Sequence, residues 1–300
     1  MKAKTIRTVL KAKVKEWSDT ITDLEVRKKV LEDTIITGGC IASMFLEEKV
    51  RDYDVYFKTK DTVYSIAKYY VDLFNKKNTT QKAWVDTRPG EPRVQIMIKS
   101  AGVAVENEEK EEVPGYQYFE QTDPEEGLSE EYIGELMKIA RAKERGKDKY
   151  RPVFLSSNAI TLTDKIQIVV RFFGDADEIH ENFDFVHCKN YYLSGENKLV
   201  LNPDALECLL AKELRYDGSL YPLCSIVRTR KFIRRGWSIH AGQYLKMCMQ
   251  LAELDLTDIH VLQEQMTGVD VAYFYEVLQM IKDKKDITAS YVMEIVDRLM

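Results

Sequence analysis

The sequence predicts an α+β protein in which a small mixed β-sheet is flanked by helices and followed by an all-helical C-terminal domain. Three observations lead to this fold class. Apolar residues recur at helical spacing in residues 1–33, short β-branched and aromatic runs alternate with helical stretches over 34–202, and helical periodicity resumes over 203–300. We therefore expect two N-terminal helices, a mixed domain and a helical domain within these three ranges.

The composition excludes several other classes of protein. Apolar residues make up 45% and charged residues 31% of the 300 residues, which is the balance of a globular chain rather than a disordered one. Five cysteines without a CxxC pair argue against a disulfide framework and against a zinc ribbon. The sequence contains no apolar window long enough to span a bilayer and no secretory signal, so we expect a cytoplasmic protein without a membrane partner.

The net charge of −5 is unevenly distributed along the chain. Between Glu106 and Glu131, eleven acidic residues are opposed by one lysine, which leaves about +5 for the rest. This stretch is interrupted by prolines and glycines and has no period, so we expect an acidic insertion or loop at about 106–131. A mildly basic body can still bind an anionic polymer, because phosphate contacts depend on local charge.

The individual elements follow from local patterns. We expect helices over 3–17, 23–33, from Gly39 through Glu48, from Asp61 as the capping residue to about Lys77, and near 130–145. We expect strands over 34–37, 52–57, 82–87, 93–99, 101–106, 152–155, 159–162, 166–173, 183–187 and 191–192. Beyond Pro203 the pattern is helical, with Gly236 as a stop signal, and Asp175 is expected to cap a short helix.

The chemistry of the chain is indicated by a strand, the pair Gly38-Gly39, a helix, and then a strand that carries Asp52 and Asp54. Glycines without a β-carbon let a phosphate approach the backbone, and the N–H groups that open a helix attract it. Two carboxylates two residues apart on a strand share one face at a backbone separation of about 7 Å. Such a pair is costly to ionise unless a divalent cation such as Mg²⁺ lies between the two groups, so metal-assisted phosphoryl or nucleotidyl transfer is the natural interpretation.

These motifs resemble the DNA polymerase β-type nucleotidyltransferases, and in spacing they are most similar to the head domain of CCA-adding enzymes and bacterial poly(A) polymerases. Ala42-Ser43 replaces the Arg-Asp of that subgroup, and Ser43 is instead similar to the serine that other members place near the triphosphate. The resemblance implies an enzyme that uses Mg²⁺ or Mn²⁺ to transfer NMP from an NTP to an acceptor hydroxyl. The expected acceptor is RNA, for instance a tRNA end, and Asp52, Asp54, Gly38, Gly39 and Ser43 are the expected site.

Two further groups are candidates for the same site. Members of the resembled family use a third carboxylate on an adjacent strand, and Asp184 is the best candidate for it, as a metal ligand or as the group that activates the acceptor. Its alternative role is that of an edge-strand or capping acid. Arg234 and Arg235 lie in a basic segment that resembles the RRDFTIN segment of CCA-adding enzymes and are expected to bind the nucleotide or acceptor, with a solvated helix face as the alternative.

Several alternatives stay open for the chain as a whole. The glycine pair could close an ordinary turn, with the aspartates on a solvated strand edge. Within the same fold, a protein-modifying or toxin-type transferase is one alternative, and a non-catalytic RNA-binding or assembly protein is another. His187 and Cys188 lack ligand spacing to the other histidines, so we expect a core or surface role for both rather than a metal site.

Overall fold

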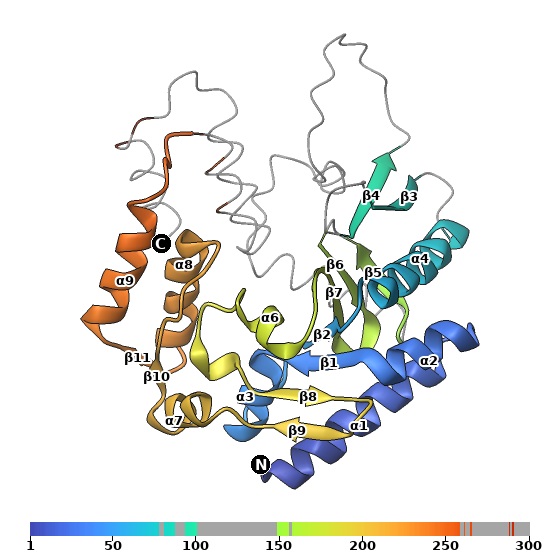
Figure 1. Cartoon of the computed structure of the whole chain (residues 1–300), viewed down its shortest axis with the longest axis horizontal. Helices are drawn as coiled ribbons and strands as arrows, with labels where there is room; N and C mark the ends of the chain where they lie inside the picture. Colours follow the sequence, from blue (N-terminus) through green and yellow to red (C-terminus); the bar gives the residue numbers. More distant parts are fainter. Residues whose placement is uncertain are drawn as a thin grey trace. The chain divides into compact units, whose positions relative to one another are not determined.

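The computed structural model describes residues 1–77, 81–87, 94–100, 149–155 and 158–258, and the single positions 261, 265, 288 and 290 (Figure 1). The acidic segment 106–131, the expected strand 101–106 and the expected helix near 130–145 lie outside these residues. The chain divides into two compact units. The first comprises Met1–Asp123, Gly146–His180 and Cys188–Asn202, and the second comprises Pro124–Arg145, Glu181–His187 and Pro203–Met300.

A mixed seven-stranded sheet forms the centre of the first unit, with the strand order β5-β6-β7-β2-β1-β8-β9. Its strands are β1 (Thr34–Thr37), β2 (Tyr53–Phe57), β5 (Pro152–Leu155), β6 (Ala159–Leu162), β7 (Ile166–Phe173), β8 (Tyr191–Leu193) and β9 (Lys198–Val200). β2 and β7 are parallel and the other neighbours are antiparallel. A separate antiparallel hairpin consists of β3 (Gln81–Asp86) and β4 (Gln95–Ser100). The expected mixed sheet is therefore confirmed.

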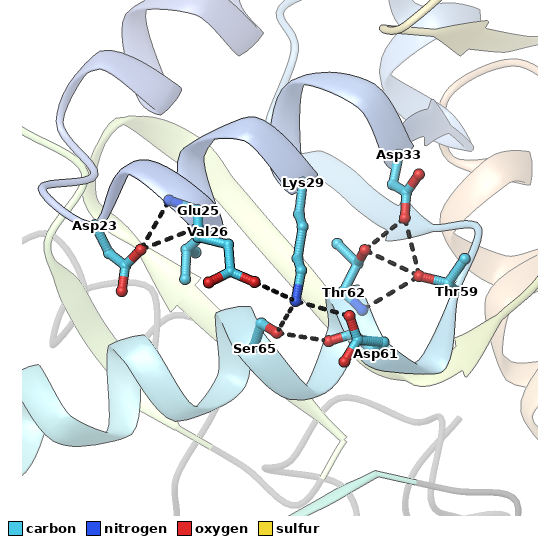
Figure 2. Close-up of polar contacts among 9 residues, drawn as sticks. All are labelled: Asp23, Glu25, Val26, Lys29, Asp33, Thr59, Asp61, Thr62 and Ser65. Atoms are coloured by element: carbon cyan, nitrogen blue, oxygen red, sulfur yellow. Dashed lines mark hydrogen bonds and ion pairs between the residues drawn. The ribbon is translucent and has the colours of Figure 1, made fainter.

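The helices of the first unit are α1 (Ala3–Asp19), α2 (Leu24–Asp33), α3 (Gly39–Phe45), α4 (Lys60–Lys77) and α6 (Ala176–His180). The expected cap at Asp175 is confirmed, since its carboxylate accepts hydrogen bonds from the N–H groups of Asp177 and Glu178. Asp61 was the wrong choice of cap for α4. The hydroxyl of Thr59 accepts the N–H of Thr62 instead, and Asp61 lies in the first helical turn (Figure 2).

One face of the sheet forms the core with the helices. Its buried residues include Ile36, Val55 and Ile168, and they belong to one cluster with residues of α1, α2 and α4. Within that cluster the indole N–H of the fully buried Trp17 donates to the hydroxyl of Tyr70 at 2.7 Å, which satisfies the polar atoms of two large core side chains. The strands therefore direct every second residue away from this core, to the opposite face.

The second unit contains α7 (Pro203–Ala211), α8 (Pro222–Ile233) and α9 (Ala241–Leu251), which agrees with the helical character expected after Pro203. Two very short strands, β10 (Glu213–Leu214) and β11 (Ser238–Ile239), pair in parallel, so this region is largely helical rather than all-helical as expected. Gly236 has a φ of 80° and follows the end of α8, as expected for a stop signal.

The strand expected over 183–187 is wrong. Phe185 makes an isolated β-bridge with Tyr216, and a 3₁₀ turn begins at Val186. Two backbone hydrogen bonds flank the bridge, one between Val186 and Arg215 and one between Asp217 and Asp184, and the pairing continues no further. Five alternating residues resemble a strand in sequence, but too little partner chain runs beside them to build one.

All five cysteines are free in the structure. Within the described ranges, no helix combines the length and the apolar composition that crossing a bilayer requires.

Candidate functional site

The glycine pair connects β1 to α3 and is in contact with the strand that carries the aspartates. Gly38 has φ 87° and ψ −156°, a conformation that L side chains rarely adopt. A β-carbon on Gly38 would lie 3.0 Å from Oδ2 of Asp54, whereas one on Gly39 would meet no described atom within 4 Å. The first glycine is therefore required by the backbone and by Asp54, and the second borders open space at the start of α3.

A row of polar side chains crosses the sheet at this point. Register pairs Thr37 of β1 with Asp54 of β2, and Asp54 in turn with Gln167 of β7. The row continues to Thr161 on one side and to Tyr191 on the other. Residues in register point to the same face, and their neighbours Ile36, Val55 and Ile168 belong to the core, so this row lies on the face opposite α1, α2 and α4.

The two aspartates are two residues apart at the start of β2. Asp54 lies in β2, and Asp52 lies two residues earlier, next to the first residue of that strand. Both side chains are half-buried. The residue in register with Asp54 on the adjacent strand β7 is Gln167, an amide, so this neighbouring position adds a polar group but no third carboxylate.

A buried hydrogen-bond network surrounds Thr37, the residue that precedes the glycine turn. The hydroxyl of Thr37 donates to the carbonyl oxygen of Asn190 at 2.9 Å and lies 2.8 Å from Nε2 of His180. A hydroxyl has one proton, so Nε2 of His180 donates to Thr37 in this arrangement. The N–H of Gly38 donates to the carbonyl oxygen of Cys188 at 3.1 Å. These bonds hold the end of β1 where the glycine turn begins.

His180 is neutral at physiological pH, because burial, and secondarily the charge of Lys189, lowers its pKa to about 4. Sequence reasoning missed both His180 and Thr37. They are 143 residues apart in the chain, and only the folded sheet brings them together. The position of Thr37 directly before Gly38 was the one local signal that could have pointed to it.

Helix α3 contains two more side chains relevant to the site, Cys40 and Ser43. Ser43 lies one helical turn after Gly39 and is buried. Cys40 donates its thiol to the carbonyl oxygen of Thr37, and its pKa is raised well above the usual value by burial and by the charge of Asp54. The thiol is therefore protonated at neutral pH.

The residues present fit a magnesium ion held partly by substrate. Among the described residues, no group of three or more His, Cys, Asp or Glu side chains is placed to hold a metal ion. Mg²⁺ is commonly bound by one or two carboxylates together with substrate phosphates and water, so the pair Asp52 and Asp54 meets its needs when a triphosphate is present.

Asp184, Arg234 and Arg235 belong to the second unit. The largely buried carboxylate of Asp184 accepts a 2.6 Å hydrogen bond from Arg228, with which it forms an ion pair. Arg234 follows the last residue of α8 and is exposed, and the guanidinium of Arg235 lies 5.8 Å from the ring centroid of Phe232. Both positive charges are therefore near the negative end of the α8 dipole.

Of the core and surface roles expected for His187, the structure shows the core role. Its side chain is 1% exposed and packs against Phe232 and Trp237, with ring centroids 4.7 and 4.4 Å away. Burial lowers its pKa to about 4, with a smaller contribution from Arg235, so the ring is a neutral part of an aromatic cluster.

The fold and the site define the class of the protein: an α+β chain with a mixed sheet, flanking helices and a glycine turn packed on an aspartate strand. The family can be stated as well. Residues 8–212 match the model of the family described as "Gabija anti-defense 2 family protein", and the chain belongs to that family. This family is distinct from the CCA-adding and poly(A)-polymerase subgroup to which the motif spacing is most similar.

Individual relatives are more distant. A curated protein named "Gabija anti-defense 2", from Bacillus phage SPbetaL7, is 23% identical over 124 residues, which cover 41% of this chain and 30% of that protein. Two solved structures of CCA-adding enzymes are similar, each with a TM-score of 0.38. The Thermotoga maritima enzyme, complexed with tRNA, is 10% identical and matched over 90% of this chain and 53% of its own. The enzyme complexed with CTP is 12% identical, with 92% and 56% covered.

Proposed function

We propose that this protein is a divalent-metal-dependent nucleotidyltransferase that transfers NMP from an NTP to an acceptor hydroxyl. The observation that carries the proposal is the contact between Gly38 and the carboxylate of Asp54. It joins a backbone turn suited to phosphate with a carboxylate pair suited to Mg²⁺. A glycine turn alone, or a pair of aspartates alone, would be weak support for a nucleotidyltransferase site. The proximity of Gly38 to Asp54 supports the proposal that the two motifs act together.

In this proposal each residue of the first unit has a distinct role. Asp52 and Asp54 hold Mg²⁺ or Mn²⁺, which neutralises phosphate charge and orients the reacting oxygens when bound. The backbone N–H groups at Gly38 and Gly39, with Ser43, bind the triphosphate. The acceptor oxygen forms a bond to the α-phosphorus, the bond between that phosphorus and the bridging oxygen of the β-phosphate breaks, pyrophosphate leaves, and the acceptor proton passes to solvent.

The second unit has assigned roles that depend on the same proposal. Asp184 is the proposed third carboxylate, which binds a second ion or activates the acceptor hydroxyl. The ion pair with Arg228 gives this carboxylate a competing structural role. Arg234 and Arg235 are the proposed contacts to nucleotide or acceptor.

We take RNA as the acceptor, because its phosphates match exposed cationic side chains of the chain, of which Arg234 is one. The family favours a second candidate. A protein described as anti-defense acts against a defence system, and nucleotidylation of a Gabija protein would be a direct route to that effect. Both candidates use the same site and the same transfer step, and they differ in the molecule that becomes labelled.

The acceptor can be identified by label transfer. The purified chain is incubated with Mg²⁺ or Mn²⁺, each α-labelled NTP, total bacterial RNA and, separately, purified Gabija proteins. We expect the label in RNA. Label in polypeptide with RNA inert would favour the second candidate. RNA binding without label in any fraction, at any metal concentration, would favour a non-catalytic RNA-binding protein and overturn the proposal.

A further inference from the structure

A cleft of about 550 Å³ lies between the start of α1 and the β8–β9 hairpin of the first unit. The two elements are in contact, and Figure 1 shows α1 beside β9. The cleft is lined by residues Ala3, Lys4, Arg7, Glu196, Asn197, Lys198 and Leu199. It is therefore built from two elements that the proposed catalytic residues do not belong to.

The cations of this cleft form no ion pair with a carboxylate among the described residues. Lys4, Arg7 and Lys198 are exposed, and none of them forms an ion pair with a carboxylate in the part of the chain that the structure describes. The acidic lining residue Glu196 lies 3.7 Å from the ammonium of Lys58 and is already paired. The cleft therefore has an excess of positive charge.

A second cleft, of about 590 Å³ between α2 and α4, shows the contrast. There the ammonium of Lys29 lies 2.7 Å from Asp61 and 3.6 Å from Glu25, and it also donates to the hydroxyl of Ser65 (Figure 2). The positive charge of the second cleft is therefore partly neutralised by carboxylates that line the same cleft. The cleft at α1 is similar in size, but its cations form no ion pair with the described carboxylates.

The positive charge continues along α1. Lys4, Arg7 and Lys11 follow one another at helical spacing on its exposed side, with axial rises of about 4.5 and 6 Å. No acidic residue precedes Glu16 in this helix. Between the cations, the cleft offers the partly buried side chain of Leu199 and the amide of Asn197, whose oxygen accepts a hydrogen bond from Tyr192. The lining therefore combines cations with an apolar side chain and an amide. Cations can bind the phosphates of a nucleic acid, and apolar and amide groups can contact the sugars or bases between those phosphates.

The register of the sheet relates this cleft to the proposed active site. Lys198 pairs with Leu193, and Leu193 pairs with Ile35, which precedes Gly38 by three residues or about 10 Å of strand. Because Ile35 and Thr37 are two residues apart, Lys198 projects to the same face of the sheet as Asp54. In contrast, α1 and Leu199 belong to the core face, so the cleft lies at the β9 edge of the sheet. A strand bound along the cleft could reach the glycine turn within a few nucleotides.

We propose that this cleft binds the phosphodiester backbone of a single-stranded RNA through Lys4, Arg7 and Lys198. That this RNA is the acceptor rests on the proposed function, whereas the binding itself does not. The cleft would hold the acceptor strand at the sheet edge and leave the catalytic face free for the nucleotide.

The test is a salt titration of RNA affinity without NTP or metal. Fluorescence anisotropy with a labelled 20-nucleotide RNA is measured from 50 to 300 mM NaCl for wild type, for K198A, and for the triple variant K4A/R7A/K198A. A matched variant, K28A/K68A/K76A, removes three exposed lysines from α2 and α4 and changes the net charge equally. We expect the log–log salt slope to fall by about 0.7 per lost phosphate contact in the cleft variants, and by much less in the matched variant.

Several outcomes would overturn the inference. They are RNA binding with an unchanged slope in the triple variant, an equal loss in the matched variant, the absence of RNA binding, and cleft-dependent binding of an acidic protein instead of RNA. Melting temperatures are measured for all variants. If the triple variant melts much lower than wild type, the salt slope of the single variant K198A is compared with wild type instead. Cleft-dependent RNA binding together with an absence of label transfer by wild type would contradict the proposed function while supporting the cleft.

Discussion

A β-carbon on Gly38 would lie 3.0 Å from Oδ2 of Asp54, so the glycine turn and the aspartate strand contact each other directly. This contact accounts for the glycine on steric grounds, in addition to its positive φ. It also explains how two short motifs, separated by α3 in the chain, form one site.

Gly38→Ala is expected to lower the free energy of unfolding by about 1–3 kcal/mol, because a side chain is strained at this φ and would press on Asp54. Gly39→Ala is the matched control, since its β-carbon would meet no described atom within 4 Å. Urea unfolding curves of the two variants test this difference. Equal stability losses at the two glycines would contradict the described turn.

Asp54→Asn and Asp52→Asn are each expected to reduce NMP transfer by several orders of magnitude while the fold stays intact. Each removes a carboxylate that stabilises transition-state charge through the metal, and every 1.4 kcal/mol lost costs about tenfold in rate. Asp72→Asn, on the exposed side of α4, is the control for the loss of one negative charge. Steady-state rates with saturating Mg²⁺ test the assignment, and near-wild-type rates in either site variant would refute it.

Thr37→Val is expected to destabilise the protein by about 1–3 kcal/mol, because it leaves Nε2–H of His180 and the carbonyl oxygen of Asn190 without their shared partner. Thr37→Ser keeps the hydroxyl and should restore most of the stability. Thermal unfolding of both variants measures the effect. A valine variant as stable as the serine variant would show that the network contributes little.

The stability of the protein should decrease as the pH falls from about 6.5 towards 4. Burial lowers the pKa of His180 and of His187 to about 4, whereas both titrate near 6.5 in the unfolded chain. Between these values the unfolded chain binds more protons, so the free energy of unfolding falls by up to about 1.4 kcal/mol per pH unit for each histidine.

Chemical denaturation from pH 7.5 to pH 4 checks this dependence. The contribution of the two histidines is complete above about pH 6.5, and His180→Gln should flatten the curve below that pH. An unchanged pH dependence in this variant would show that His180 does not titrate as described. Carboxylates add their own acid sensitivity in both proteins, so the difference between the two curves is the quantity to compare.

The roles proposed for Asp184 separate in kinetics and stability. Its ion pair with Arg228 predicts that Asp184→Asn lowers the melting temperature, because the partly exposed guanidinium of Arg228 loses its largely buried carboxylate partner. Arg228→Met should have a comparable effect on melting. A catalytic Asp184 predicts in addition a fall in kcat in the asparagine variant that the methionine variant does not show. A melting loss with an unchanged kcat would remove Asp184 from the site.

Local patterns predicted those parts of the fold that local interactions determine. The strand, glycine pair, helix and aspartate strand are close in sequence, and their spacing was sufficient to place Gly38 and Asp54 in one candidate site. The cap of α4 was misassigned because Asp61 and Thr59 are both good capping residues, and the choice depends on Asp33, which accepts a hydrogen bond from Thr59.

Other features depend on contacts between distant segments. The bond between Thr37 and His180 could not be predicted, because it requires the sheet to bring α6 to the end of β1. The segment around Phe185 alternates like a strand but has only a short partner at Tyr216. The cleft at α1 could not be predicted either. The periodicity of this helix indicates which residues enter the core, but it does not indicate which cations form ion pairs in the folded chain.

The most direct test of the proposed active site is pyrophosphate release from an NTP by the purified chain, measured with Mg²⁺ and RNA and repeated for D54N and in EDTA. The account predicts release by wild type that requires the metal, and a loss of several orders of magnitude in D54N. Equal release by wild type and D54N, or release that persists in EDTA, would contradict it.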